Sequence, residues 1–388
     1  MSNVYFLGSV VPPANSAIAD AFSYAGNASQ LGVINGLVDA GVSVRLVISY
    51  VPNRVFPFGS KLIVGRKEYS YNGVRYICLP YLNLPGFREI TFNFFALIVL
   101  LRIVLSRDVI ISYNIGIPSG VVPWLLRLFR QVKIIVLAYD VHIPGETVPD
   151  SFRWRFEFLK HKWLLPKFSG VVAINKNIIE DFGCRDGIVV EGGVAEVLPL
   201  PCFESVASTP HFTIVYAGRL TAENGISLIL TAFHRINRSD VKLVIMGEGP
   251  LCESVVEAAN NDKRIIFLGL VPHSEVLEAY SRADLLLCVR LTELVNTRFF
   301  FPSKLIEYMT SGVPVLSTLV SGASFDLAEY VYLLPSETVE SLAESLEKIY
   351  LTPKEERRQK AAHARIFAKE YFLWKNQARR IKEFIEKL

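Results

Sequence analysis

The sequence lacks the grouped cysteines and acidic motifs that hold metals or disulfide frameworks. Its five cysteines are scattered, and none stands in a CxxC or CxxxH spacing; they are Cys78, Cys184, Cys202, Cys252 and Cys288. Zinc sites and disulfide frameworks need closely spaced or paired cysteines, so we expect buried free thiols. The chain also contains no Asp-x-Asp motif, and we expect no bound metal.

Long hydrophobic runs are absent as well. A membrane-spanning helix needs roughly 18 apolar residues in a row, whereas the longest candidate begins at Phe92 and is interrupted by Arg102. The first residues, MSNVYFLGSVVPP, lack the basic segment and small-residue cleavage site of a secretory signal and read as a first strand. We therefore expect a cytoplasmic protein.

Apolar residues are nevertheless abundant, which points to large folded cores. The chain has 388 residues, 51% of them hydrophobic, and this length favours two domains. Charge is unevenly shared: residues 1–200 hold 19 Lys and Arg against 14 Asp and Glu, and the remainder holds 22 against 23. The N-terminal half is therefore the one expected to face an anionic partner.

Short apolar strands alternate with helices along the whole chain, which predicts parallel sheets covered on both faces. The pattern stops in a Gly-, Pro- and Ser-rich stretch around 195–210 and then restarts. We predict an α/β protein with an N-terminal Rossmann-like domain over 1–200, a second such domain over 201–370, and a C-terminal helix over 371–388 that packs back on the first. Ligands of such domains normally bind at the carboxyl ends of the strands.

Four stretches of the second half carry a resemblance to a known family. They are YAGRLTAENGISLIL, VIMGEGP, IIFLGLVPHSEVLEAYSRADLLLCV and PSKLIEYMTSGVPV, and they lie within residues 212–320. In order and spacing they resemble the retaining, group 1 (family 4-like) glycosyltransferases of the GT-B fold. In this fold two doubly wound domains face a central cleft. The resemblance implies a nucleotide-sugar donor bound by the second domain and an acceptor bound by the first.

The start of the helix in FPSKLIEYM suits the phosphates and ribose of such a donor. The first amides of a helix have no internal partners and attract phosphate, so we expect the amides of Ser303, Lys304 and Leu305 to bind it, together with the Lys304 side chain. Glu307 lies on the same face; the family uses the equivalent glutamate to accept hydrogen bonds from the ribose. The alternative is a Lys304–Glu307 ion pair on the helix surface.

Further site residues follow from strand ends. Gly218 and Arg219 follow the strand FTIVYA, where a guanidinium binds phosphate in bidentate fashion, and Gly247 follows VKLVIM. Asp140 and His142 follow VKIIVLAY in the first half. The family often has a histidine there, near donor sugar and acceptor, although a buried structural histidine is the alternative.

Gly26 and Asn27 complete the predicted site. We place them in a turn before a helix over Ala28–Ala40, where a glycine lets the backbone approach a phosphate. A turn glycine without a ligand is the alternative.

Two positions depart from the family pattern. A lysine usually stands five residues after the arginine, where this chain has Asn224, and a first glutamate usually stands at Phe299. We hypothesise that Lys304 also supplies the charge missing at Asn224. The loss at Phe299 suits a deoxy sugar, or a contact taken over by Glu293, Asn296 or Thr297.

The resemblance implies a metal-independent, retaining hexosyl- or deoxyhexosyltransferase of polysaccharide or glycolipid biosynthesis. It has no cofactor beyond its donor substrate. A nucleotide-sugar epimerase shares this architecture and is one alternative. The other is a catalytically weak binding subunit, which Asn224 and Phe299 motivate.

Residues 151–168, SFRWRFEFLKHKWLLPKF, interleave cations with aromatic side chains. Such a segment suits the surface of an anionic membrane, and peripheral contact would place the protein at the inner face of that membrane. An amphipathic helix with its aromatic side chains in the core is the equal alternative. We recognise no nucleic-acid motif and expect no nucleic-acid partner.

Overall fold

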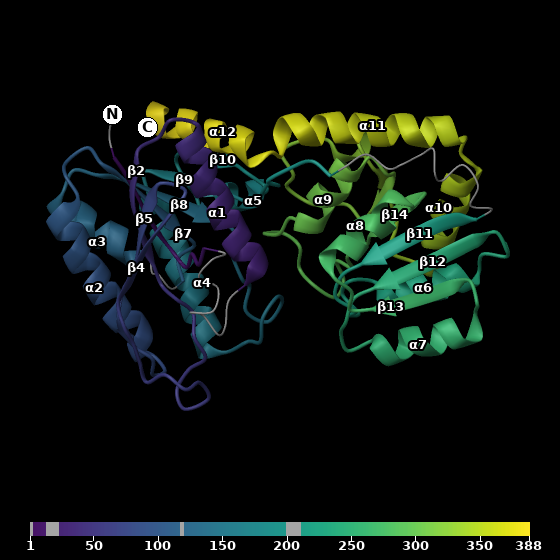
Figure 1. The fold of residues 1–388 in the computed structure, drawn as a ribbon, viewed down its shortest axis with the longest axis horizontal. Helices are drawn as coiled ribbons and strands as arrows, with labels where there is room; N and C mark the ends of the chain where they lie inside the picture. Colours follow the sequence, from purple (N-terminus) through teal and green to yellow (C-terminus); the bar gives the residue numbers. More distant parts are fainter. Residues whose placement is uncertain (1–2, 13–22, 117–119, 199–210) are drawn as a thin grey trace. The chain divides into compact units, whose positions relative to one another are not determined.

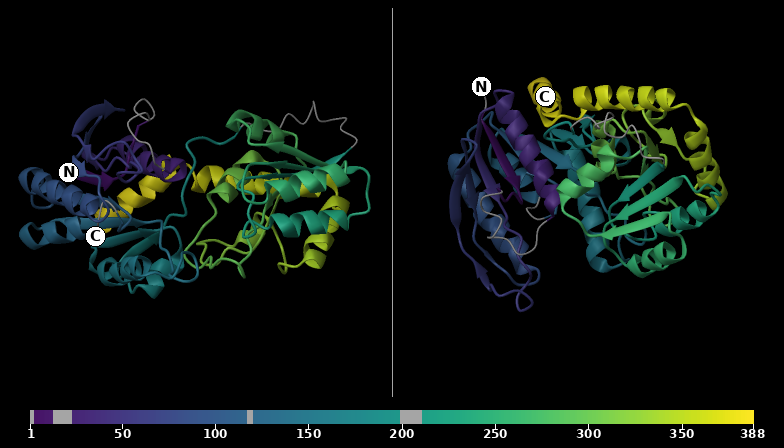
Figure 2. Two further views of the ribbon diagram at one scale, coloured as in Figure 1. Left: turned by 90° about the horizontal axis from the view of Figure 1, so that it is seen from below. Right: turned by 45° about the vertical axis from the view of Figure 1, so that its right-hand side comes forward.

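The computed structural model describes residues 3–12, 23–116, 120–198 and 211–388, and these form two compact units (Figures 1 and 2). Unit 1 comprises residues 1–195, 298–301 and 374–388, and unit 2 comprises 196–297 and 302–373. The C-terminal helix belongs to unit 1. The return of the chain to unit 1 at 298–301 was not predicted.

Unit 1 is built on an eight-stranded sheet in the order β10-β9-β8-β7-β1-β2-β5-β4. All neighbouring pairs are parallel except β4 and β5. The strands are β1 (Val4–Gly8), β2 (Val44–Ser49), β4 (Lys67–Tyr71), β5 (Val74–Cys78), β7 (Val109–Tyr113), β8 (Lys133–Ala138), β9 (Gly170–Ala173) and β10 (Gly187–Val189). A separate antiparallel pair joins β3 (Ile63–Val64) to β6 (Tyr81–Leu82).

Successive residues of the central strands are buried on opposite faces of this sheet. Val4 and Phe6 join one hydrophobic core, and Tyr5 and Leu7 join the other. The first core is closed by α1 (Tyr24–Asp39) and α12 (Trp374–Lys387). The second is covered by α2 (Phe87–Ile103), α3 (Val121–Phe129), α4 (Phe152–Leu164), the short helix η2 (Leu165–Lys167) and α5 (Lys176–Asp181).

Two glycines of α1 explain how closely the C-terminal helix packs on it (Figure 1). A Cβ at Gly32 would lie 2.2 Å from Nε1 of Trp374, and one at Gly36 would lie 2.7 Å from its carbonyl oxygen. Any side chain at these positions would push α12 away from α1. The two glycines therefore leave α1 without side chains where α12 contacts it, and this lets the last helix pack closely on unit 1.

Unit 2 contains a six-stranded parallel sheet in the order β13-β12-β11-β14-β15-β16. The strands are β11 (Phe212–Ala217), β12 (Val241–Met246), β13 (Ile265–Gly269), β14 (Leu285–Cys288), β15 (Val315–Ser317) and β16 (Tyr332–Leu333). The helices are α6 (Ile226–His234), α7 (Cys252–Asn261), α8 (His273–Ser281), α9 (Ser303–Ser311), η3 (Leu327–Glu329), α10 (Val339–Leu351) and α11 (Lys354–Tyr371). The predicted α/β alternation is confirmed.

The described cysteines are free thiols. Cys78 and Cys288 are buried, whereas Cys184 and Cys252 are only partly covered; Cys202 lies outside the described residues. No described helix has both the length and the apolar character needed to cross a bilayer.

Candidate functional site

The predicted residues of unit 2 gather at the carboxyl ends of its strands, beginning with two glycine turns. Gly218 follows β11 and Gly247 follows β12, with φ values of +147° and +131°. A Cβ at Gly247 would lie 1.9 Å from the carbonyl oxygen of Gly218. Only glycine lets these two turns approach each other. We call this end of the sheet, where β11 and β12 finish, the rim.

Arg219 and Asn224 lie beside this rim and are joined through the backbone. The Arg219 side chain is exposed, while its carbonyl oxygen accepts hydrogen bonds from Asn224 Nδ2 at 3.0 Å and from the Tyr216 hydroxyl at 2.9 Å. Asn224 therefore closes the loop that carries Arg219. Its amide side chain adds no charge of its own.

Sequence reasoning missed Arg290, which brings a cation to Asn224. Arg290 lies two residues beyond β14, and its Nη1 donates to Asn224 Oδ1 at 3.2 Å. The Thr318 hydroxyl accepts from the Arg290 backbone amide at 3.1 Å, which holds the strand end in place. The strand-end argument that singled out Arg219 applies equally to DLLLCVR, and that signal identifies Arg290.

The first hydrogen bond of helix α9 changes which of its amides are open to a ligand. Pro302 is the N-cap, and Ser303 is the first helical residue. The Leu305 amide donates to the Pro302 carbonyl oxygen at 2.9 Å, so the prediction that it is open to a phosphate is wrong. The amides of Ser303 and Lys304 remain at helical positions that have no internal acceptor.

Lys304 lies against the strand end rather than along the helix surface. Its Nζ is 4.3 Å from the centroid of the Tyr216 ring, and a Cβ at Gly218 would lie 3.0 Å from it. Burial lowers the pKa of the Lys304 ammonium, and the nearby Arg290 acts in the same direction. Two cations from different elements thus lie near one another at this rim.

Glu307 has a carboxylate that the described residues leave without a hydrogen bond. Its Oε1 is buried and has no hydrogen-bond partner; Nε2 of the exposed His273 lies 3.8 Å from it. Burial raises the pKa of this carboxyl, opposed by His273 and then Lys304. The predicted alternative of a Lys304–Glu307 ion pair is not what these contacts show.

Glu307→Gln is expected to stabilise the ligand-free protein at neutral pH. Because the folded pKa is raised, wild-type stability falls as the pH rises through that pKa. A neutral amide avoids this loss. The melting temperature of the variant should match that of the wild type at acidic pH and exceed it near pH 7, where the wild-type carboxyl must carry a charge. The control is Glu275→Gln, which changes an exposed acidic residue of α8. If the melting temperatures of Glu307→Gln and the wild type change with pH in the same way, the expectation is contradicted.

Of the predicted site residues of unit 1, Asp140 and His142 are exposed to solvent. Asp140 is exposed and accepts from Asn114 Nδ2 at 2.7 Å. His142 is also exposed, with its ring 5.1 Å from that of Trp154, so the alternative of a buried structural histidine is wrong.

Gly26 and Asn27 do not lie in a loop before the helix. Both are helical residues near the start of α1, where the Ser23 hydroxyl accepts a hydrogen bond from the Gly26 amide at 3.1 Å. The Asn27 side chain exchanges two hydrogen bonds with the Val11 backbone, both at 2.8 Å. Their polar groups thus hold the start of α1 to the segment after β1, and the predicted open glycine turn is wrong.

Phe299 lies in the hydrophobic core of unit 1. It is 7% exposed, and its ring centroid is 5.4 Å from that of Phe182. The candidate substitutes Glu293, Asn296 and Thr297 belong to unit 2. A residue at position 299 therefore serves packing in this chain.

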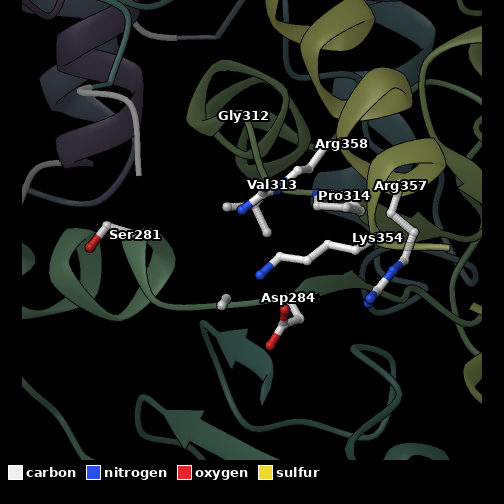
Figure 3. Close-up of a pocket in the computed structure, with 9 residues that line it drawn as sticks. Ser281, Asp284, Gly312, Val313, Pro314, Lys354, Arg357 and Arg358 are labelled. Carbon is white, nitrogen blue, oxygen red and sulfur yellow. The ribbon is translucent and has the colours of Figure 1, made fainter. Parts of the chain in front are cut away.

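A small pocket of unit 2 lies at the opposite edge of the sheet (Figure 3). Asp284 directly precedes β14, and Gly312, Val313 and Pro314 precede β15. Three cations of α11 complete the lining: Lys354, Arg357 and Arg358. The guanidinium of Arg357 also covers the Phe212 ring at 4.6 Å. Because this is the amino-terminal edge of the strands, it is distinct from the rim that carries Lys304 and Glu307.

Comparisons with known proteins find matches to the part of the chain that carries these residues. Residues 203–366 match the model of "Glycosyl transferases group 1". A phosphatidylinositol N-acetylglucosaminyltransferase subunit of Homo sapiens is 28% identical over 181 residues, which are 45% of this chain and 36% of the human protein. The match thus spans only about a third of that relative.

Solved structures resemble the whole chain. Sucrose-phosphate synthase from Thermosynechococcus elongatus has a TM-score of 0.70 at 16% identity, over 99% of this chain and 98% of that one. Anabaena Alr3699/HepE in complex with UDP has a TM-score of 0.68 at 15% identity, over 100% of both chains. The predicted GT-B fold is confirmed, and over residues 203–366 the chain matches the group 1 glycosyl transferases that its sequence motifs resemble.

Proposed function

We propose that this protein is a retaining glycosyltransferase with a nucleotide-diphosphate sugar as donor. The observation that carries the proposal is the buried, unbonded carboxylate oxygen of Glu307, one helical turn from Lys304. A ribose offers two hydroxyl donors to such a carboxylate, and a diphosphate suits the neighbouring cations and helix amides. The HepE structure is a complex with UDP, which supports a nucleotide ligand for this fold.

The residues of unit 2 would stabilise the leaving group. In the proposed step the bond between the anomeric carbon and the diphosphate oxygen breaks, and the acceptor hydroxyl oxygen bonds to the same face of that carbon. The hydroxyl proton passes to the departing diphosphate, which leaves as the nucleoside diphosphate. Arg219, Arg290, Lys304 and the Ser303 amide supply preorganised positive charge where negative charge develops, so the step needs no metal.

Unit 1 would bind the acceptor, with the exposed His142 and Asp140 as the polar groups on that side. We propose a glycan or lipid-linked acceptor in polysaccharide or glycolipid biosynthesis, consistent with the phosphatidylinositol in the name of the human relative. We further propose a cytoplasmic protein that works at the inner face of a membrane through residues 151–168.

A thermal-shift screen with UDP, GDP and dTDP, each free and as its sugar conjugate, tests the donor. A ligand present at 100 times its Kd and bound only by the folded state stabilises by about 2.7 kcal/mol, so one nucleotide should raise the melting temperature by several degrees. No shift with any of them would overturn the proposal. Release of nucleoside diphosphate with sugar transfer then identifies a transferase; binding without turnover identifies a binding subunit, and isomerised donor identifies an epimerase.

A further inference from the structure

Helices α2, α3 and α4 form a continuous layer on one face of unit 1. Helix α2 packs on α3, and the rings of Trp124 in α3 and Trp163 in α4 are 4.9 Å apart. The Lys160 ammonium of α4 lies 3.4 Å from the Glu89 carboxylate of α2. We call the outer side of this layer the α2–α3–α4 surface.

This surface carries most of the exposed aromatic side chains of the described protein. Its exposed large apolar residues are Phe87, Ile90, Phe94 and Phe95 in α2, Leu128 and Phe129 in α3, and Phe152, Phe156, Leu159 and Trp163 in α4. Outside these helices, the only exposed Phe or Trp among the described residues is Phe58. The alternative that the aromatic side chains of α4 are mainly in the core is therefore wrong.

The exposed large apolar residues of α4 follow the repeat of the helix. Phe152, Phe156, Leu159 and Trp163 are spaced at i, i+4, i+7 and i+11, so they form one stripe along the helix. Phe152 is 85% exposed. A stripe of this kind suits a flat apolar boundary that runs parallel to the helix axis.

The three helices together carry more cations than acids, and their acids are paired. The two acidic residues of the three helices, Glu89 and Glu157, both contact Lys160, whose side chain is only 8% exposed. The remaining cations of the helices are Arg88, Arg102, Arg127, Arg153, Arg155 and Lys162. Arg155 pairs with Asp150 just before α4, whereas the exposed Arg153 lies over the Trp154 ring, 5.4 Å from its centroid.

We propose that the α2–α3–α4 surface is a docking site for the surface of an anionic lipid bilayer, with α2 and α3 contributing as much as the 151–168 segment. Aromatic side chains enter the boundary between headgroups and acyl chains, and cations bind the anionic headgroups. Ten exposed large apolar side chains on three adjacent helices point to a binding surface, since exposed apolar patches often mark sites of interaction with a partner or a membrane. The inference rests on the membrane contact proposed above for residues 151–168, and not on the proposed sugar transfer.

Flotation of the full chain with phosphatidylglycerol-containing vesicles, compared with pure phosphatidylcholine vesicles, tests the proposal. We expect binding to the anionic vesicles at low salt and a marked loss at high salt. The double variant Phe152→Ser/Phe156→Ser and the α2 variant Phe94→Ser/Phe95→Ser should each lower the partition coefficient about tenfold. Phe58→Ser, which removes an aromatic side chain that is 88% exposed, is the matched control and should bind as the wild type does.

Several outcomes would overturn the proposal. They are no flotation of the wild type, equal flotation of the α2 variant and wild type, and binding to RNA in place of vesicles. Charge reversal by Arg153→Glu/Lys162→Glu should weaken binding to anionic vesicles only. The melting temperature of every variant without ligand shows that it is folded. The nucleotide-induced shift of the same variants reports on the proposed function separately from docking.

Discussion

Arg290→Ala is expected to weaken binding of the donor nucleotide by about 10- to 100-fold. The expectation follows from the contact between Arg290 Nη1 and Asn224 Oδ1, which brings a guanidinium to the position where the family usually has a lysine. A hydrogen bond to a charged group contributes about 1.5–3 kcal/mol, and each 1.4 kcal/mol is a factor of ten in Kd. Titration calorimetry with the nucleotide that gives the largest thermal shift measures the change.

The double variant Arg290→Ala/Asn224→Lys tests whether Arg290 supplies the positive charge that the family usually has at position 224. It should regain a large part of the lost affinity, because a lysine at 224 restores a cation beside the Arg219 carbonyl oxygen. Arg235→Ala, which removes an exposed cation paired with Glu340 in α10 of the same unit, is the control. If Arg290→Ala binds normally, Arg290 does not supply the charge missing at Asn224, and the hypothesis that Lys304 supplies it stands. If the double variant binds no better than the single one, a lysine at 224 does not replace Arg290.

Residues at strand ends were predictable because a parallel sheet brings its carboxyl ends together whatever the details of packing. Gly218, Arg219 and Gly247 follow β11 and β12 as expected, and the same rule extends to Arg290 after β14. The rule says which elements meet, but not which side chain reaches which. The contact between Arg290 and Asn224 depends on loop conformations that strand patterns do not determine.

The predictions of an open Leu305 amide and an open turn at Gly26 were wrong because local hydrogen bonds occupy both helix starts. The Leu305 amide turns back to Pro302, and the Gly26 amide is capped by the Ser23 hydroxyl. A serine three residues before the residue it caps is a known helix-start pattern, so the start of α1 near Tyr24 was readable from the sequence. The tightened first turn of α9 was not, because nothing in PSKL distinguishes an i+3 from an i+4 bond.

Long-range packing decides which hydrophobic core an apolar residue joins. The segment FFFPS, residues 299–303, is an example. Arg298 pairs with Asp181 of α5, and the Asn177 side chain donates to the Arg298 carbonyl oxygen at 2.9 Å. The Asn175 side chain likewise donates to the Phe300 carbonyl oxygen at 3.2 Å. These contacts anchor the segment 298–301 on α5 of unit 1, although its neighbours in sequence belong to unit 2. A family motif aligned by spacing alone gives no sign of this.

Phe299→Glu, which introduces the residue type that the family usually has here, is therefore expected to destabilise unit 1. Truncating a buried Phe costs about 3–5 kcal/mol, and a buried carboxylate without a partner adds to that cost. For a unit of this size each kcal/mol lowers the melting temperature by about 2–4 °C. We expect a drop of roughly 10 °C or more in a thermal melt.

The matched variants separate packing from sugar recognition at this position. Phe299→Leu keeps the site apolar and should cost much less than Phe299→Glu, because it removes only part of the buried surface. Arg298→Ala breaks an ion pair that is half exposed and should cost under about 1 kcal/mol. A Phe299→Glu protein that melts like the wild type and changes its preference among donor sugars would contradict the core assignment. It would mean that the carboxylate leaves the contact with Phe182 and lies beside the sugar, and the missing glutamate would then be a determinant of donor specificity rather than a core residue.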